Sequence, residues 1–137
     1  MSGRVQVTGS VNRLLWPRLR ALGFAFQFSK DRDRWTEGEP LVRTGTHGWQ
    51  QGLLIGRDKF GGVFGINAGR ELPDGTWEYL DMARVGLRRA ELSYANQAEL
   101  EAVLDRIASV MENHVIRWLD EEPPIPGPSR SSSMGGA

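Results

Sequence analysis

The sequence predicts an α+β fold: an N-terminal helix, an antiparallel meander of about four to six strands and a long C-terminal helix. Three observations predict it. Apolar residues recur at helical spacing near each end of the chain. Between these regions, large apolar residues alternate with small or polar ones, as in half-buried strands. Because the connections are short, we expect consecutive strands to be neighbours and both helices to pack on one sheet face.

The first helix is expected to begin at Ser10, whose side chain suits a helix N-cap. Gly23 ends the pattern, as a left-handed residue after a helix does. Pro17 lies inside it, so the helix either kinks there or a shorter helix begins there. The apolar positions of this helix are Val11, Leu14, Leu15, Leu19 and Leu22.

The central segment "HGWQQGLLIGRDKFGGVFGINAG" predicts a β-hairpin. Eight of the 17 glycines lie between Gly45 and Gly69, and in both runs they alternate with larger residues. A turn of two or four residues would set Leu53 opposite Ile66, whereas a three-residue turn with a bulge would shift this pairing. Either way the glycines share one face, which the chain itself covers, which stays open, or which binds a partner.

A phosphate-binding loop is the alternative interpretation of the same glycines. Such a loop leads from a strand into a helix N-terminus. Here "GGVFGINAG" leads into a second strand-like run, so the sheet interpretation is favoured.

Shorter strands are expected near 34–37 and within 77–92, with Val85 and Leu87 facing inward. Asn96, with Glu99 three residues later, predicts the N-cap of the long C-terminal helix. The apolar stripe of that helix consists of Leu100, Val103, Leu104, Ile107, Met111, Val115 and Trp118.

Residues 10–121 are therefore expected to form a single domain. Residues 1–9 are expected to be a flexible N-terminus or a short strand. The Pro-, Ser- and Gly-rich residues 122–137 cannot bury enough apolar area to order themselves and predict a disordered tail. Its "PPIPGP" is also the composition of a polyproline ligand, although a solvated tail is the simpler interpretation.

Composition excludes several classes of function. Lys plus Arg equals Asp plus Glu, 17 each, so a strongly electrostatic partner such as duplex DNA is not favoured. The chain has no Cys, which removes disulfides, thiolate nucleophiles and Cys-ligated zinc. No apolar run reaches the length of a membrane span or a signal peptide. A cytoplasmic location without membrane association is the expectation.

Three pieces, "LLWPRLRALGF", "GGVFGINAG" and "HVIRWLDE", together resemble the bacterial domain of unknown function 4304 family. The matching positions are Pro17, Leu19, Gly23 and Phe24; Ile66, Asn67 and Gly69; and Ile116 and Trp118. The "RVG" of Arg84 to Gly86 matches an Arg-containing strand. The resemblance covers about residues 10–121 and implies an α+β fold without established chemistry. It also implies a small accessory protein of bacteria or phages, immunity-like in some members.

Candidate chemistry is sparse. His47 and His114 are the only side chains whose reference pKa lies near neutrality, and their spacing does not suit a metal. The Asp31 and Asp33 pair is flanked by basic residues and predicts a salt-bridged surface. No cofactor or metal is therefore expected, and catalysis is not favoured.

Protein binding remains as the leading hypothesis, because tryptophan and arginine anchor interfaces. We expect a small, cytoplasmic, non-catalytic binding or accessory domain. One alternative is a nucleic-acid-binding accessory protein; another is a small-molecule enzyme using His47 or a carboxylate. The sequence leaves the oligomeric state open. The candidate partner-binding residues are Trp35, His47, Trp49, Arg57, Trp77, Arg84 and Arg88.

Overall fold

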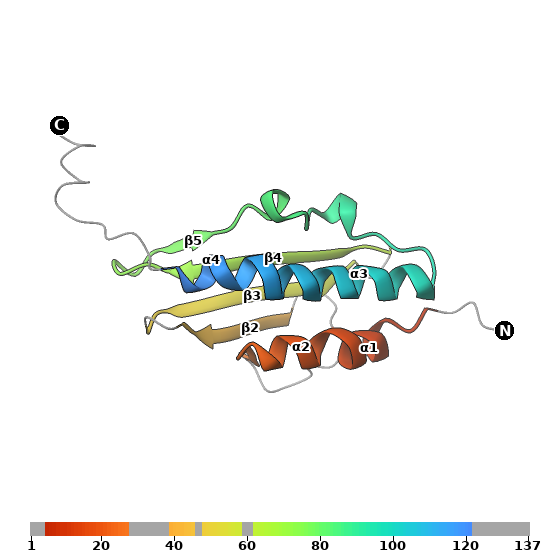
Figure 1. Cartoon of the computed structure of the whole chain (residues 1–137), viewed down its shortest axis with the longest axis horizontal. Helices are drawn as coiled ribbons and strands as arrows, with labels where there is room; N and C mark the ends of the chain where they lie inside the picture. Colours follow the sequence, from red (N-terminus) through yellow and green to blue (C-terminus); the bar gives the residue numbers. More distant parts are fainter. Residues whose placement is uncertain (1–4, 28–38, 46–47, 59–61, 122–137) are drawn as a thin grey trace.

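A computed structural model of the protein describes residues 5–27, 39–45, 48–58 and 62–121. They form an α+β fold with one antiparallel sheet, whose strands follow chain order as in a meander (Figure 1). The predicted fold class is thereby confirmed. The strands are β1 (Ala25–Phe26), β2 (Glu39–Thr44), β3 (Gln50–Arg57), β4 (Phe64–Glu71) and β5 (Trp77–Tyr79).

The N-terminal helix consists of α1 (Val7–Ser10), a wider π-helical turn η1 (Val11–Leu15) and α2 (Trp16–Ala21). The prediction of Ser10 as the N-cap is wrong: the N-cap position is Gln6, four residues earlier, and the helix begins at Val7. Ser10 is buried inside the helix, and its hydroxyl accepts a hydrogen bond from Gln97 Nε2 at 2.8 Å.

Pro17 lies inside the N-terminal helix as the second residue of α2, separated by one residue from the wider turn η1, so the irregularity expected near the proline lies in the turn before it. A proline has no N–H to donate, and its ring collides with the carbonyl four residues earlier. The wider turn relieves both problems and lets the helix continue to Ala21. Gly23 then has φ of 102°, which confirms its predicted role as the left-handed residue after the helix.

The C-terminal helix consists of α3 (Gln97–Val110), a second wider turn η4 (Met111–Val115) and α4 (Ile116–Asp120). Asn96 is its N-cap, as predicted: Oδ1 accepts the Glu99 N–H at 2.8 Å. The Glu99 carboxylate accepts the N–H of Ala95, also at 2.8 Å. This helix runs beside the N-terminal helix along the sheet (Figure 1).

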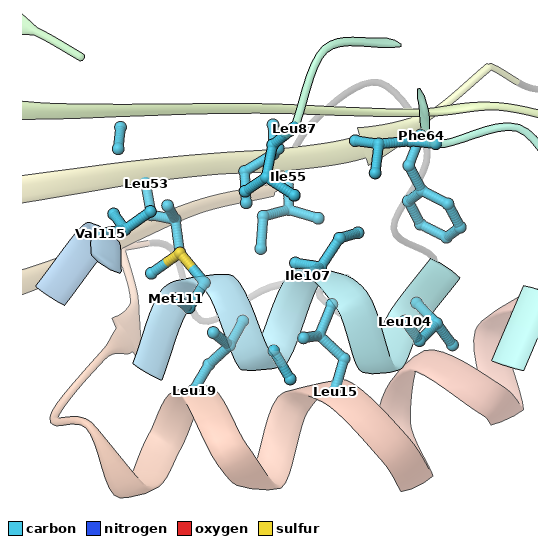
Figure 2. Packing of buried hydrophobic residues seen from close by; sticks show 14 of the residues in the cluster. Leu15, Leu19, Leu53, Ile55, Phe64, Leu87, Leu104, Ile107, Met111 and Val115 are labelled. Carbon is cyan, nitrogen blue, oxygen red and sulfur yellow. The ribbon is translucent and has the colours of Figure 1, made fainter. Parts of the chain in front are cut away.

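The core lies between the sheet and these two helices. Figure 2 shows sheet residues such as Ile55 and Phe64 meeting Ile107 and Met111 of the long helix, with Leu15 of the first helix below. All five side chains are fully buried. The predicted apolar stripe of the long helix is buried from Leu100 to Val115, and Trp118 beyond it is half-buried.

The hairpin register differs from the predicted one. Ile55 pairs with Ile66 and Leu53 with Ala68, so each residue's partner lies two positions from the expected one. Because side chains alternate with a period of two, a shift by two leaves every residue on its expected face. The large apolar residues face the helices, and the glycines face away from them.

After β5 the chain forms two short 3₁₀ helices, η2 (Met82–Val85) and η3 (Arg89–Glu91), rather than a second strand. Leu87 between them is buried, as expected, and Val85 is half-buried. The expected strand near 34–37 and the expected tail 122–137 lie outside the described residues.

Candidate functional site

The sheet face that points away from the helices carries paired glycines. Gly52 pairs with Gly69, and Gly56 pairs with Gly65, on the two central strands. Both long helices pack on the opposite face, so neither of them lies over these glycines. We call this surface the open sheet face and define it by the outward residues of β3, β4 and β5. They are Gln50, Gly52, Leu54, Gly56, Gly65, Asn67, Gly69, Glu71, Trp77 and Tyr79.

Aromatic side chains of the edge strand β5 lie over two of these glycines. A Cβ placed on Gly69 would lie 2.8 Å from the ring of Tyr79, its cross-strand partner. A Cβ placed on Gly52 would lie 3.5 Å from the six-membered ring of Trp77. Trp77 pairs with Glu71 on β4, so its ring crosses β4 diagonally to reach Gly52 on β3. The absence of side chains at both glycines makes these ring positions possible.

The aromatic rings border a groove of about 590 Å³ on the open sheet face. Gly52 and Gly69 lie in the floor, with Leu54 among the remaining lining residues. Leu54 is 42% exposed, Trp77 41% and Tyr79 70%, and they are the exposed large hydrophobic residues of the described chain. A volume of this size lies within the range of small-ligand and peptide sites.

Uncharged polar groups complete the lining. Gln27, Gln50 and Asn67 contribute carboxamides, which both donate and accept hydrogen bonds. None of the described residues that line the groove carries a charged side chain. The groove therefore suits a neutral, partly apolar ligand.

Charged groups lie beyond both ends of the groove. At one end, the Glu71 carboxylate accepts the backbone N–H of Gln50 at 3.3 Å. Toward the other end, Arg89 lies over Gly65 and pairs with Asp58 at 3.6 Å. At that end the ion pair compensates the charge of Arg89.

A second polar cluster lies on the helix side of the sheet, at the end of α4. Arg43 donates from Nη1 and Nη2 to the two carboxylate oxygens of Asp120, at 2.9 and 3.2 Å. The buried side chain of Gln51 donates to the backbone carbonyl of Leu119 at 2.7 Å and accepts from Arg43. The Gln51 bond satisfies a backbone carbonyl that the end of a helix leaves without an intrahelical partner.

Arg70 belongs to the same cluster and is 5% exposed. Nη1 donates to the carbonyl of Trp118 at 2.6 Å, and Nε donates to Glu78 at 2.9 Å. The guanidinium also lies 4.3 Å from the centre of the Trp118 ring. Arg70 forms these contacts with other residues of the chain. The cluster therefore connects α4 to the sheet, and we interpret it as structural rather than as a ligand site. The positive charge of Arg70 also lies near the C-terminus of α4, where it interacts favourably with the negative end of the helix dipole.

The arginines of the first helix do not form an open basic patch. Arg18 bonds to Glu112 and Asp105 of the long helix, and Arg13 lies 3.7 Å from Glu101. These carboxylates neutralise the charge that a nucleic-acid phosphate would need. The Arg18 hydrogen bonds also hold the pKa of Glu112 below its ordinary value.

Of the sequence-predicted candidates, the structure brings Trp77 into the groove. Trp49 is half-buried at the sheet end near Gly45 and Glu121. Arg57 is half-buried at the end of β3, and within the described residues its Nε finds no hydrogen-bond partner. Arg84 and Arg88 are exposed in the segment after β5, and Arg88 pairs with Glu91 at 3.6 Å. Trp35 and His47 lie outside the described residues.

Two groove residues, Leu54 and Tyr79, were missed as site candidates by sequence reasoning. A signal for Tyr79 exists, because Trp77 and Tyr79 are two residues apart and therefore share a strand face. The sequence does not show which face that is. His114, the remaining histidine, is exposed on the long helix and lies far from the groove lining in the fold.

Comparison of the chain with protein-family models, with curated proteins and with solved structures finds no match. The resemblance to the domain of unknown function 4304 family thus remains an expectation of the sequence. In the part of the chain that the structure describes, no three His, Cys, Asp or Glu side chains gather where they could hold a metal ion. None of the helices there has the length and apolar character that crossing a membrane requires.

Proposed function

We propose that this chain is a small, non-catalytic binding domain that recognises another protein through the open sheet face. The observation that carries the proposal is the exposure of Leu54, Trp77 and Tyr79 around one uncharged groove. Exposed apolar residues are ordinary when they are scattered, but three large ones around a groove mark an interaction surface. Tryptophan and tyrosine are also among the residues that contribute most to protein interfaces.

The chemistry of the lining supports binding over catalysis. General acid–base catalysis needs a group that exchanges a proton near the working pH. Within the described lining of the groove, the titratable side chain is the tyrosine at position 79. Because Gly52 and Gly69 lie in the floor of the groove, the aromatic rings can lie against the strands. This arrangement provides apolar contact area for a partner and does not position a nucleophile.

The proposal is tested by first identifying a protein that the tagged wild-type chain retains. The affinity of groove variants and of control variants for that protein is then compared. The wild-type chain, tagged, is expected to retain a stoichiometric partner. Tyr79→Ser and Leu54→Asp are expected to lose at least tenfold in affinity for it, because each removes apolar contact from the groove. Arg84→Ala and Arg117→Ala, exposed and away from the groove, are the matched controls.

Circular dichroism and the unfolding midpoint of each variant distinguish lost binding from lost folding. Equal capture by the groove variants and the controls would contradict the proposal. Robust turnover of a substrate that survives both groove substitutions would contradict it as well.

A further inference from the structure

The groove and the Pro-rich run "PPIPGP" are complementary in their chemistry. A polyproline segment is stiff, offers apolar rings and backbone carbonyls, and lacks N–H groups at its prolines. Proteins bind such segments in grooves lined by aromatic side chains. Trp77 and Tyr79 supply aromatic surface, together with an indole N–H and a hydroxyl that can donate to carbonyls.

The position where the tail begins is the second observation. Arg70 Nη1 donates to the carbonyl of Glu121 at 3.3 Å. In the sheet register Arg70 pairs with Glu78, which stands between Trp77 and Tyr79 on β5. The chain therefore leaves the folded part on the helix side of the sheet, at the sheet end where Glu121 lies beside Arg70 and Trp49. In the described sheet β5 is an edge strand, so one strand separates Glu121 from the groove.

The length of the tail is sufficient to turn around that edge. Packed sheet layers are about 10 Å apart and neighbouring strands about 5 Å. A polyproline helix advances about 3.1 Å per residue, so any run of six residues in that conformation spans about 19 Å. Turning around β5 would use about 15 Å of this length, so the first prolines would cross the edge and the last ones, up to Pro128, would reach the aromatic rings.

Charge does not oppose this placement. Pro123–Pro128 contains four prolines, Ile125 and Gly127 and carries no charge. The described groove lining is likewise uncharged. Because both partners are neutral, placing the segment in the groove buries no unpaired charge, which would cost several kcal/mol.

We propose that the groove on the open sheet face binds this chain's own segment Pro123–Pro128. The inference rests on the proposed function, since it takes the same groove as the binding surface. It adds that the chain carries an internal competitor for its partner. Intramolecular attachment gives such a segment an effective concentration in the millimolar range, so weak contacts suffice to occupy the groove.

The test uses the full chain with a single spin label on the tail. The sequence has no Cys, so Ser131→Cys offers one attachment site for a nitroxide. In the labelled chain, the amide signals of Gly52 and Gly69 and the indole signal of Trp77 are expected to broaden. Signals of the helix side, such as those of Ala108, are expected to change much less.

The matched control replaces the four prolines of the segment by serine in the same labelled chain. Tail length and charge stay the same, but the stiff apolar surface is lost. At least a threefold decrease in the broadening of Gly52 and Gly69 is expected. Tyr79→Ala, which alters the groove instead of the tail, is expected to give the same decrease.

Equal broadening in the proline and serine tails would overturn the inference. So would broadening that appears only when labelled chains are mixed with separate isotope-enriched chains, because the segment would then bind another copy. Neither result affects the partner-capture experiment. The two experiments therefore distinguish whether the internal segment fails to bind the groove from whether the groove fails to bind a partner protein. If both hold, the four-serine tail captures the partner more tightly than the wild-type chain.

Discussion

Arg18 of α2 donates two hydrogen bonds to the Glu112 carboxylate of the C-terminal helix, from Nε to Oε2 at 2.8 Å and from Nη2 to Oε1 at 2.6 Å. The pair joins two helices that are far apart in the sequence. Its two-point geometry is the strong form of an arginine–carboxylate contact. Both side chains are about one-third exposed, so water screens part of the attraction.

The Arg18–Glu112 pair predicts a specific pH dependence of stability. Because the pKa of Glu112 is lowered in the folded state, its stabilisation is present above the unfolded-state pKa and disappears as the pH falls through the folded-state pKa. Glu112→Gln is expected to cost about 0.5–1 kcal/mol at pH 7. Urea unfolding at pH 7 and at about pH 3 measures whether the difference from wild type disappears in acid.

Asp105→Asn is the matched control for this prediction. Asp105 accepts a single bond from Arg18 at 2.9 Å and is 72% exposed, so its loss should matter less. A Glu112→Gln penalty that is the same at both pH values would show that the carboxylate charge is not the stabilising feature.

The two glycines of β4 on the open sheet face should respond differently to a methyl group. Gly69→Ala places a Cβ 2.8 Å from the Tyr79 ring and is expected to destabilise the fold by about 1–3 kcal/mol. Gly65→Ala meets the end of the flexible Arg89 side chain at 3.3 Å and should be neutral or stabilising by up to about 1 kcal/mol. Thermal and urea unfolding of the two variants measure the difference.

A double substitution identifies the cause. In Gly69→Ala with Tyr79→Ala, the colliding ring is absent, so most of the Gly69→Ala penalty should disappear. If the penalty persists at full size, the ring contact is not its origin.

Ile107 tests whether the stripe of the long helix is the core of the domain. Its side chain is fully buried between the helices and the sheet. Ile107→Asp is expected to prevent folding, because an unpaired buried charge costs several kcal/mol and total stability is roughly 5–15 kcal/mol. Ile107→Val, which removes one methylene, should cost about 0.5–1.5 kcal/mol. A cooperative urea transition in the Asp variant would contradict this.

Gly9 and Gly86 provide a second contrast between helix and turn positions. Gly9 lies in α1, and a Cβ there meets nothing within 4 Å, so Gly9→Ala should stabilise by about 0.5–1 kcal/mol. Gly86 has φ of 79° and its Cβ would lie 2.8 Å from Arg106 Nη2, so Gly86→Ala should destabilise. Melting temperatures that move in the same direction for both would refute the argument.

Features that depend on neighbouring residues were predictable from the sequence. Gly23 after the first helix, Asn96 before the last one and the alternation along β3 and β4 each have a local physical cause. The start at Val7 was not predictable, because Gln6 makes no side-chain cap and Ser10 looks like one. The hairpin register was also open, because a Gly-rich loop accepts several turn geometries.

The groove required information that no local pattern holds. It arises because β3, β4 and β5 place Gly52, Gly69 and Tyr79 in one row across the sheet. The burial of Arg70 was not predictable either. Its charge suggests a surface residue, but it is buried, and the backbone carbonyl of Trp118 in α4 accepts one of its hydrogen bonds. Both depend on pairings between residues far apart in the chain.

The pairing of the first helix with the last one determines when the protein can fold during synthesis. The apolar side of Val7–Ala21 and the inner face of the sheet leave the ribosome before Gln97–Asp120, which buries them. At typical translation rates the delay is on the order of ten seconds. A nascent chain that stalls before Gln97 thus exposes a wide apolar surface to chaperones and proteases. The core can be completed only after the helix that begins at Gln97 has left the ribosome.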